Sequence, residues 1–100
     1  MENKGIYHWE DDKSKLLQKT RGYSIKDIVN QIFFSGRAYL IKESPRYPNQ
    51  YRVVAKIDDM IITVAMEDID DGFGQFYRIV TYWESDSKDK KLYKKELNDG

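Results

Sequence analysis

Two arginines lie inside segments whose composition is typical of β-strands, where a long cation needs a chemical reason. Arg52 belongs to the segment YRVVAKI and Arg78 to QFYRIVTYW. Strand alternation predicts that Arg52 shares a face with Lys56, and that Arg78 shares a face with Phe76 and Tyr82. If the two faces coincide, the surface can bind phosphates and stack bases, as metal-free RNA cleavage requires. Ordinary cross-strand pairing with acids on a solvated sheet explains the same residues, so both interpretations stand at this point.

Metal-free RNA cleavage also needs groups that transfer protons. A base removes the ribose 2′-hydroxyl proton, a cation stabilises the charged phosphorus centre, and an acid protonates the leaving oxygen. His8 is the one histidine of the sequence, and histidine as a residue type titrates near neutral pH. A strand histidine that is simply packed or solvated is the alternative. Together with carboxyl and phenol candidates, the predicted catalytic residues are Arg78, Arg52, Glu67, His8 and Tyr82.

Several kinds of site are excluded by composition. The sequence has no cysteine, which excludes disulfides, thiolate zinc sites and cysteine nucleophiles. A single histidine excludes a multi-histidine metal site. The segment DIDDG lacks the spacing and closing glutamate of an EF-hand, and DGFG lacks the lysine of a phosphate-binding loop. We therefore expect neither a metal site nor a cofactor.

Length and charge limit the class of protein. One hundred residues make one domain, residues 1–100, and 14% aromatic residues can supply its core. The net charge is zero, but residues 31–56 hold five basic residues and one acid, whereas residues 57–77 hold six acids and no base. Neutrality argues against bulk nonspecific nucleic-acid binding and permits a local basic face. Solvated faces of strands and turns are the alternative explanation of these charges.

The start of the chain gives no sign of export. MENKGIYHW lacks the apolar stretch of a signal peptide, and no apolar segment is long enough to span a membrane. We expect a cytoplasmic protein with no membrane contact.

The hydrophobic pattern predicts an α+β fold. GIYHW suits a first strand, a charged helix then ends near Gly22, and Ser24 with Asp27 forms a capping box for a second helix. Strand-like segments follow over 37–43, 51–57, 60–67 and 75–83, and a charged helix ends the chain. The expected order is a strand, two helices, an antiparallel sheet of about four strands and a C-terminal helix. We expect the helices to pack on one face of the sheet.

The N-terminal motifs resemble those of a known family. WEDDK followed by RGYSIKD is similar to the N-terminus of BrnT-like toxins of type II toxin–antitoxin systems, and RYPNQYRVVAKIDD resembles a related branch of small toxins. The resemblance covers most of the chain. The positions that match at the N-terminus are Trp9, Glu10, Lys13, Arg21, Gly22 and Ser24.

The resemblance implies a compact RelE-like fold and a metal-independent endoribonuclease that inhibits translation. It also implies neutralisation by a cognate ribbon-helix-helix antitoxin. Whether the protein forms oligomers through that antitoxin is left open. On this basis we expect RNA contacts from Lys13, Arg21, Lys56 and Trp83.

The sequence departs from the family pattern at two places. The family often has a histidine at the position of Arg21, and commonly a second arginine at the position of Trp83 or Glu84. These departures keep open a noncatalytic RNA- or protein-binding module on the same fold.

Overall fold

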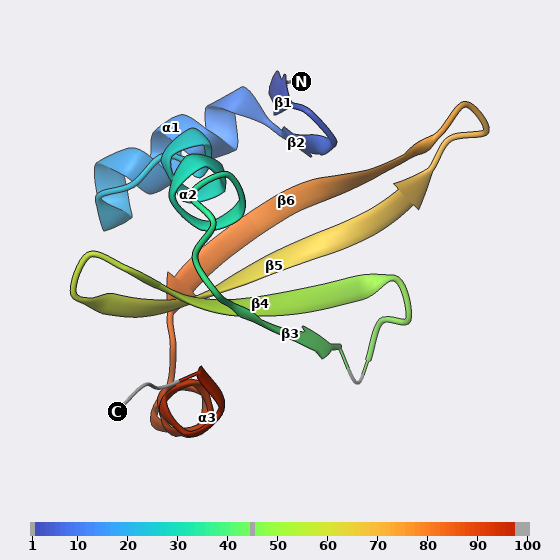
Figure 1. Cartoon of the computed structure of the whole chain (residues 1–100). Helices are drawn as coiled ribbons and strands as arrows, with labels where there is room; N and C mark the ends of the chain where they lie inside the picture. Colours follow the sequence, from blue (N-terminus) through green and yellow to red (C-terminus); the bar gives the residue numbers. More distant parts are fainter. Residues whose placement is uncertain (1, 45, 98–100) are drawn as a thin grey trace.

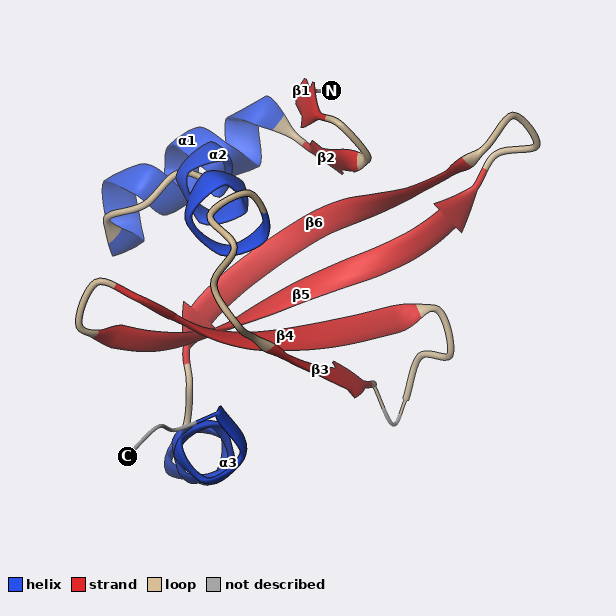
Figure 2. Cartoon of the chain, viewed as in Figure 1, coloured by secondary structure: helices blue, strands red, loops and turns tan. Residues whose placement is uncertain are grey.

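The computed structural model describes residues 2–44 and 46–97. Within them, six strands form one mixed sheet in the order β1-β2-β6-β5-β4-β3 (Figure 2). The strands are β1 Glu2–Lys4, β2 Tyr7–Trp9, β3 Leu40–Glu43, β4 Gln50–Ile57, β5 Met60–Asp70 and β6 Gln75–Glu84. All neighbours are antiparallel except β2 and β6, which run parallel.

The α+β class is confirmed, whereas the prediction of about four antiparallel strands was wrong. Gly5 has φ +61°, a left-handed conformation that glycine adopts without strain, and it reverses the chain between β1 and β2. The N-terminus therefore forms a hairpin instead of a single strand. Because β2 then pairs with the distant β6, the sheet gains two strands and becomes mixed.

Two helical segments follow β2 and pack on one side of the sheet (Figure 1). α1 spans Asp11–Arg21, and α2, Ile25–Ile28, continues as the π-helical segment η1, Val29–Phe33. The predicted left-handed cap at Gly22 is confirmed at φ 99°. The predicted capping box is confirmed as well, since the Ser24 hydroxyl accepts from the Asp27 N–H and the Asp27 carboxylate accepts from the Ser24 N–H.

The core lies between these helices and the sheet. Alternate residues of β4 and β5 point toward α2 and η1, whose apolar side chains meet them. We call this side of the sheet the α1–α2 face. Its buried residues include Ile25, Ile28, Val29, Ile32, Val53, Ala55, Ile57, Ile62, Val64, Met66 and Ile79.

The last helix, α3, spans Ser87–Leu97 and lies on the opposite side of the sheet, which we call the α3 face (Figure 1). The expectation that the helices share one face was therefore wrong. The physical reason is that Val54 and Thr63 belong to the alternate set of strand positions and need cover of their own; both are fully buried. Asp89 of α3 accepts hydrogen bonds from the Thr63 hydroxyl at 3.4 Å and the Lys42 ammonium at 2.6 Å.

A β-bulge in β6 changes which side chains share a face. Ala65 pairs with Thr81 and Met66 pairs with Ile79, so Val80 is one extra residue on β6. An extra residue reverses the alternation beyond it. Arg78 before the bulge and Trp83 after it therefore lie on the α3 face. Tyr82 lies on the α1–α2 face, so the prediction that Arg78 and Tyr82 share a face was wrong.

Among the described residues, no helix is both long and apolar enough to cross a membrane.

Candidate functional site

Four strands bring one polar side chain each to the same level of the α3 face. Gln50 of β4 pairs with Glu67 of β5, Glu67 pairs with Arg78 of β6, and Arg78 pairs with His8 of β2. Side chains of paired residues project to the same side of a sheet. We call this set, Gln50, Glu67, Arg78 and His8, the acid–base row. It gathers three residues that the sequence predicted to be catalytic, from segments far apart in the chain.

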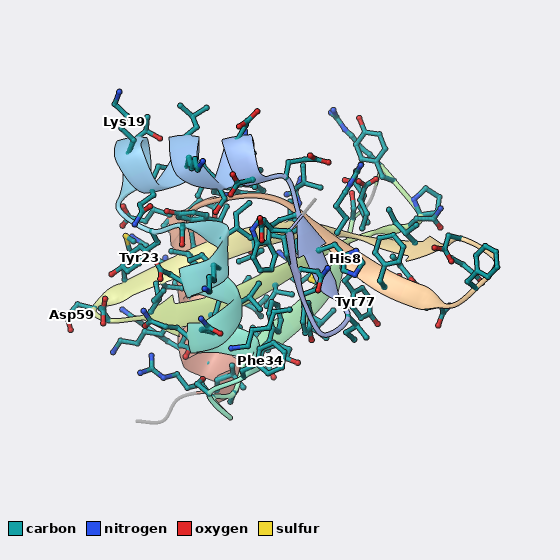
Figure 3. The ribbon with its side chains drawn as sticks, turned by 90° about the horizontal axis from the view of Figure 1, so that it is seen from above. His8, Lys19, Tyr23, Phe34, Asp59 and Tyr77 are labelled. Carbon is teal, nitrogen blue, oxygen red and sulfur yellow. The ribbon has the colours of Figure 1, made fainter. Side chains whose placement is uncertain are left out.

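The neighbours of the row show that it faces away from α1 and α2. Tyr7 and Tyr77, which precede His8 and Arg78, project to the α1–α2 face and stack there with ring centroids 5.9 Å apart. Tyr7 also stacks on Phe33 of η1 at 4.4 Å. Figure 3 shows that His8 of β2 and Tyr77 of β6 lie where the two strands meet. Strand alternation therefore places His8 and Arg78 on the α3 face.

The centre of the row is an ion pair between Arg78 and Glu67. The Arg78 Nε donates to Glu67 Oε1 at 2.9 Å, and a terminal guanidinium nitrogen donates to the same oxygen. Glu67 Oε2 has no protein hydrogen-bond partner within the described part of the chain. The side chains are 40% and 23% exposed, so the pair contributes about 1 kcal/mol or less to stability. Its chemical result is a carboxylate that is held by a cation and keeps one oxygen available.

His8 lies at the β2 end of the row. Its ring stacks on the Phe76 ring, with centroids 4.3 Å apart and planes 18° apart. The stack fixes the imidazole plane, and the ring stays partly exposed. His8 is therefore positioned beside Arg78, with part of its side chain open to a ligand.

Arg52 lies next to the row on the same face. It occupies β4 two residues after Gln50, and its guanidinium carbon lies 5.4 Å from the centroid of the Trp83 ring. A cation over an indole ring is favourable by about 0.5–1 kcal/mol at an exposed site. We call these two residues the Arg52–Trp83 platform. It pairs a positive charge with a partly exposed aromatic ring, the combination that binds a phosphate and a stacked base.

Only part of the predicted RNA-binding set lies near this platform. Lys56 is exposed on the α3 face, four residues farther along β4 than Arg52. Lys13 and Arg21 belong to α1, on the other side of the sheet (Figure 2). The Arg21 guanidinium donates to the backbone carbonyl of Tyr82. The structure thus brings Trp83 to the site and leaves Lys13 and Arg21 away from it.

Tyr82 is a structural residue in this arrangement. It is 1% exposed, its hydroxyl donates to the Tyr23 carbonyl at 2.7 Å, and the same hydroxyl accepts from the Tyr23 N–H at 3.1 Å. Burial, the largest influence, raises the pKa of the Tyr82 phenol above its ordinary value. A buried phenol that keeps its proton is unsuited to proton transfer, so Tyr82 is left out of the candidate site.

Sequence reasoning missed Gln50. Strand alternation carried back from Arg52 places Gln50 on the same face, and the predicted strand started one residue too late to include it. Its amide is the polar group of β4 opposite Glu67.

A second hollow lies on the α1–α2 face. A cavity of about 260 Å³, which we call the tyrosine cavity, opens beside η1 and the adjacent strands; it is lined by Tyr7, Phe33, Tyr39, Ile41, Tyr51, Val53, Met66 and Tyr77. None of these residues is charged. Burial is the main cause that raises the pKa of Tyr7, with smaller contributions from Tyr39 and Tyr77. This cavity therefore offers an uncharged surface of aromatic and aliphatic side chains.

Metal ligation has no basis in the described residues, which contain no group of three or more histidine, cysteine, aspartate or glutamate side chains placed to hold an ion.

The chain matches no protein-family model and no curated protein sequence. The acid–base row and the Arg52–Trp83 platform are thus the features on which a function can be argued.

Proposed function

We propose that this protein is the toxin component of a type II toxin–antitoxin system and that it cleaves RNA without a metal ion. The supporting observation is the acid–base row, in which Glu67, Arg78 and His8 come from three adjacent strands. These are the three kinds of group that such cleavage needs: a base, a cation and an acid.

The chemistry assigns one step to each side chain. Glu67 Oε2 removes the 2′-hydroxyl proton of a ribose, and the 2′-oxygen attacks the adjacent phosphorus. Arg78 and Arg52 stabilise the negative charge that develops on the phosphoryl oxygens. Protonated His8 donates to the 5′-oxygen as the P–O bond to it breaks. The products are a 2′,3′-cyclic phosphate and a 5′-hydroxyl. Their formation in this step requires neither water nor a metal ion.

The biological setting in this proposal comes from the resemblance of the N-terminal motifs. A cytoplasmic ribonuclease that inhibits translation needs an antitoxin, and the resemblance implies a ribbon-helix-helix protein. The RelE-like fold is part of the same proposal. Its support is the order of elements, in which two helices follow the N-terminal strands and precede β3 to β6.

Inducible expression in a bacterium tests this function. Wild-type protein is expected to arrest growth and degrade total RNA, and Arg78→Ala is expected to abolish both effects because it removes the cation that faces the phosphate. Arg37→Ala is the matched control, since Arg37 is an exposed arginine between η1 and β3 that lies near Lys56, six residues along β4 from Gln50. An Arg78→Ala variant as toxic as the wild type would overturn the role given to Arg78.

A noncatalytic RNA- or protein-binding module is the second candidate, and one observation favours it. The charge of Arg78 is already paired with Glu67, so less of it is available to a phosphate than if the guanidinium were unpaired. This candidate predicts RNA binding without cleavage. Intact total RNA during expression, together with binding by the purified protein, would favour it over the ribonuclease.

A further inference from the structure

Helix α3 carries an exposed stripe of lysines that no step of the proposed chemistry uses. Lys88, Lys91 and Lys95 recur at intervals of three and four residues, which places them along one side of the helix, with Lys94 beside them. All four are exposed. Among the described residues none of the four pairs with an acid, whereas Lys90 pairs with Glu84. We call Lys88, Lys91, Lys94 and Lys95 the lysine stripe.

Buried polar contacts fix α3 on the face that holds the acid–base row. The Asp89 carboxylate, 7% exposed, accepts from Lys42 at 2.6 Å and from Thr63 at 3.4 Å. The Thr63 and Ser85 hydroxyls are hydrogen-bonded at 2.8 Å at the point where the chain leaves β6 for the helix. Thr63 pairs with Trp83 across the sheet. The helix that bears the stripe is therefore anchored next to the Arg52–Trp83 platform.

We propose that the lysine stripe and the Arg52–Trp83 platform bind single-stranded RNA and lead it to the acid–base row. The lysines would contact successive phosphates, and one unpaired base would stack on the planar Arg52 guanidinium, which lies over the Trp83 ring. This inference rests on the proposed function for the direction of the RNA toward the row. It replaces the predicted contacts from Lys13 and Arg21, which lie on the other side of the sheet.

Two observations favour single-stranded RNA over duplex RNA or an acidic protein. A base must be unpaired to stack on the Arg52–Trp83 platform, which lies on a sheet face, and a duplex does not permit this. An acidic protein would use the lysines but has no group that requires an aromatic ring with a cation over it. The comparison with α1 is also informative, because Lys15 of α1 pairs with Asp11 at 3.1 Å, whereas no residue of the lysine stripe pairs with an acid within the described part of the chain.

The test measures binding of a fluorescein-labelled oligouridylate whose 2′-hydroxyls are methylated, so that cleavage cannot occur. The variant is Lys88→Gln, Lys91→Gln and Lys95→Gln combined. The matched control is Lys15→Gln, Lys19→Gln and Lys26→Gln combined, which removes the same charge from exposed positions of α1 and α2. Circular dichroism checks that both variants fold as the wild type does.

Loss of three phosphate contacts is expected to reduce the slope of log Kobs against log salt by about two, because each contact on a single strand contributes about 0.7. Affinity at low salt is expected to fall about tenfold or more in the α3 variant and little in the control. RNA is also expected to quench the fluorescence of partly exposed Trp83, and Trp83→Phe should remove that quenching.

Three results would overturn the inference. Equal losses of affinity in the α3 variant and the control would mean that RNA binding depends only on the total charge of the protein. Equal binding of a matched duplex, or displacement of the RNA by polyglutamate at equal charge concentration, would identify a general anion surface. A wild-type protein that does not bind the RNA would contradict the proposed binding site. Binding of the methylated RNA with no cleavage of its unmodified counterpart would support the inference. It would contradict only the proposed ribonuclease activity.

Discussion

On β5, Val64 and Met66 point into the core beneath α2 and η1, whereas Ala65 and Glu67, each one residue farther on, lie on the α3 face. The two sets differ in chemistry as well as in direction. The α1–α2 face holds aliphatic side chains and the uncharged tyrosine cavity. The α3 face holds the acid–base row, the Arg52–Trp83 platform and a helix with exposed lysines.

Within the same strands, the α1–α2 face supplies stability and the α3 face carries the groups that could do chemistry. Full burial of an aliphatic side chain contributes about 1.5–3 kcal/mol, so the α1–α2 face supplies most of the stability of the sheet. The half-exposed Arg78–Glu67 pair contributes about 1 kcal/mol or less. Substitutions in the row should therefore alter function while the fold persists, and substitutions one residue away should have the opposite effect.

Val64→Asp, on the α1–α2 face of β5, has the largest expected effect. Val64 is fully buried beneath α2 and η1, so the substitution would bury an unpaired carboxylate in the core. We expect a loss of about 4 kcal/mol or more in the free energy of unfolding, measured by urea denaturation.

Ala65→Asp is the control, because Ala65 is the next residue of β5, lies on the α3 face and pairs with Arg52 of β4. It should cost only about 1 kcal/mol. A Val64→Asp protein as stable as Ala65→Asp would show that the two faces of β5 do not differ in their contribution to stability.

Tyr82→Phe, on the α1–α2 face, has a smaller expected effect on stability. It removes a hydroxyl that bonds both backbone groups of Tyr23, at an expected cost of about 1–2 kcal/mol near neutral pH. The pKa of Tyr82 is raised in the folded state, so above pH 10 the unfolded chain loses its phenol proton first. The stability from this shift is complete below about pH 10 and is lost as the pH rises through the folded value.

The free energy of unfolding should therefore fall less steeply above pH 10 in Tyr82→Phe than in the wild type. Urea denaturation across that range measures the slope. Tyr93→Phe, at a partly exposed position of α3, is the control and should keep the wild-type slope. Equal slopes in the wild type and Tyr82→Phe would contradict the assignment of the shift to this phenol.

Much of the fold could be predicted from the sequence because it depends on local chemistry. The Ser24 capping box, the Gly22 cap and the apolar spacing of α2 and η1 each follow from residues within a few positions of one another. The strand segments were recognisable for the same reason, although β3 begins only at Leu40.

The parts that sequence reasoning missed depend on distant pairing. The parallel contact of β2 with β6 joins residues 70 positions apart. The β1–β2 hairpin is local, and it was missed because β1 has only three residues. The bulge at Val80 has no local sequence signal, yet it decides the face of Tyr82 and Trp83. The side on which α3 packs depends on Thr63 and Lys42, which meet Asp89 only in the folded chain. The residue types of the candidate site could therefore be predicted from the sequence, but only some of its individual residues could.

Whether the chemistry belongs to the α3 face is tested by comparing Glu67 with its neighbour Asp68, because the two acids lie on opposite faces of one strand. Purified wild-type protein, Glu67→Gln and Asp68→Asn are each incubated with single-stranded RNA in the presence of EDTA, and the rate of 2′,3′-cyclic phosphate formation is measured. We expect Glu67→Gln to lower the rate by about 10²–10⁴ while remaining folded, and Asp68→Asn to cleave at the wild-type rate. Cleavage that Glu67→Gln retains, or that both variants lose equally, would contradict the assignment of the chemistry to the α3 face.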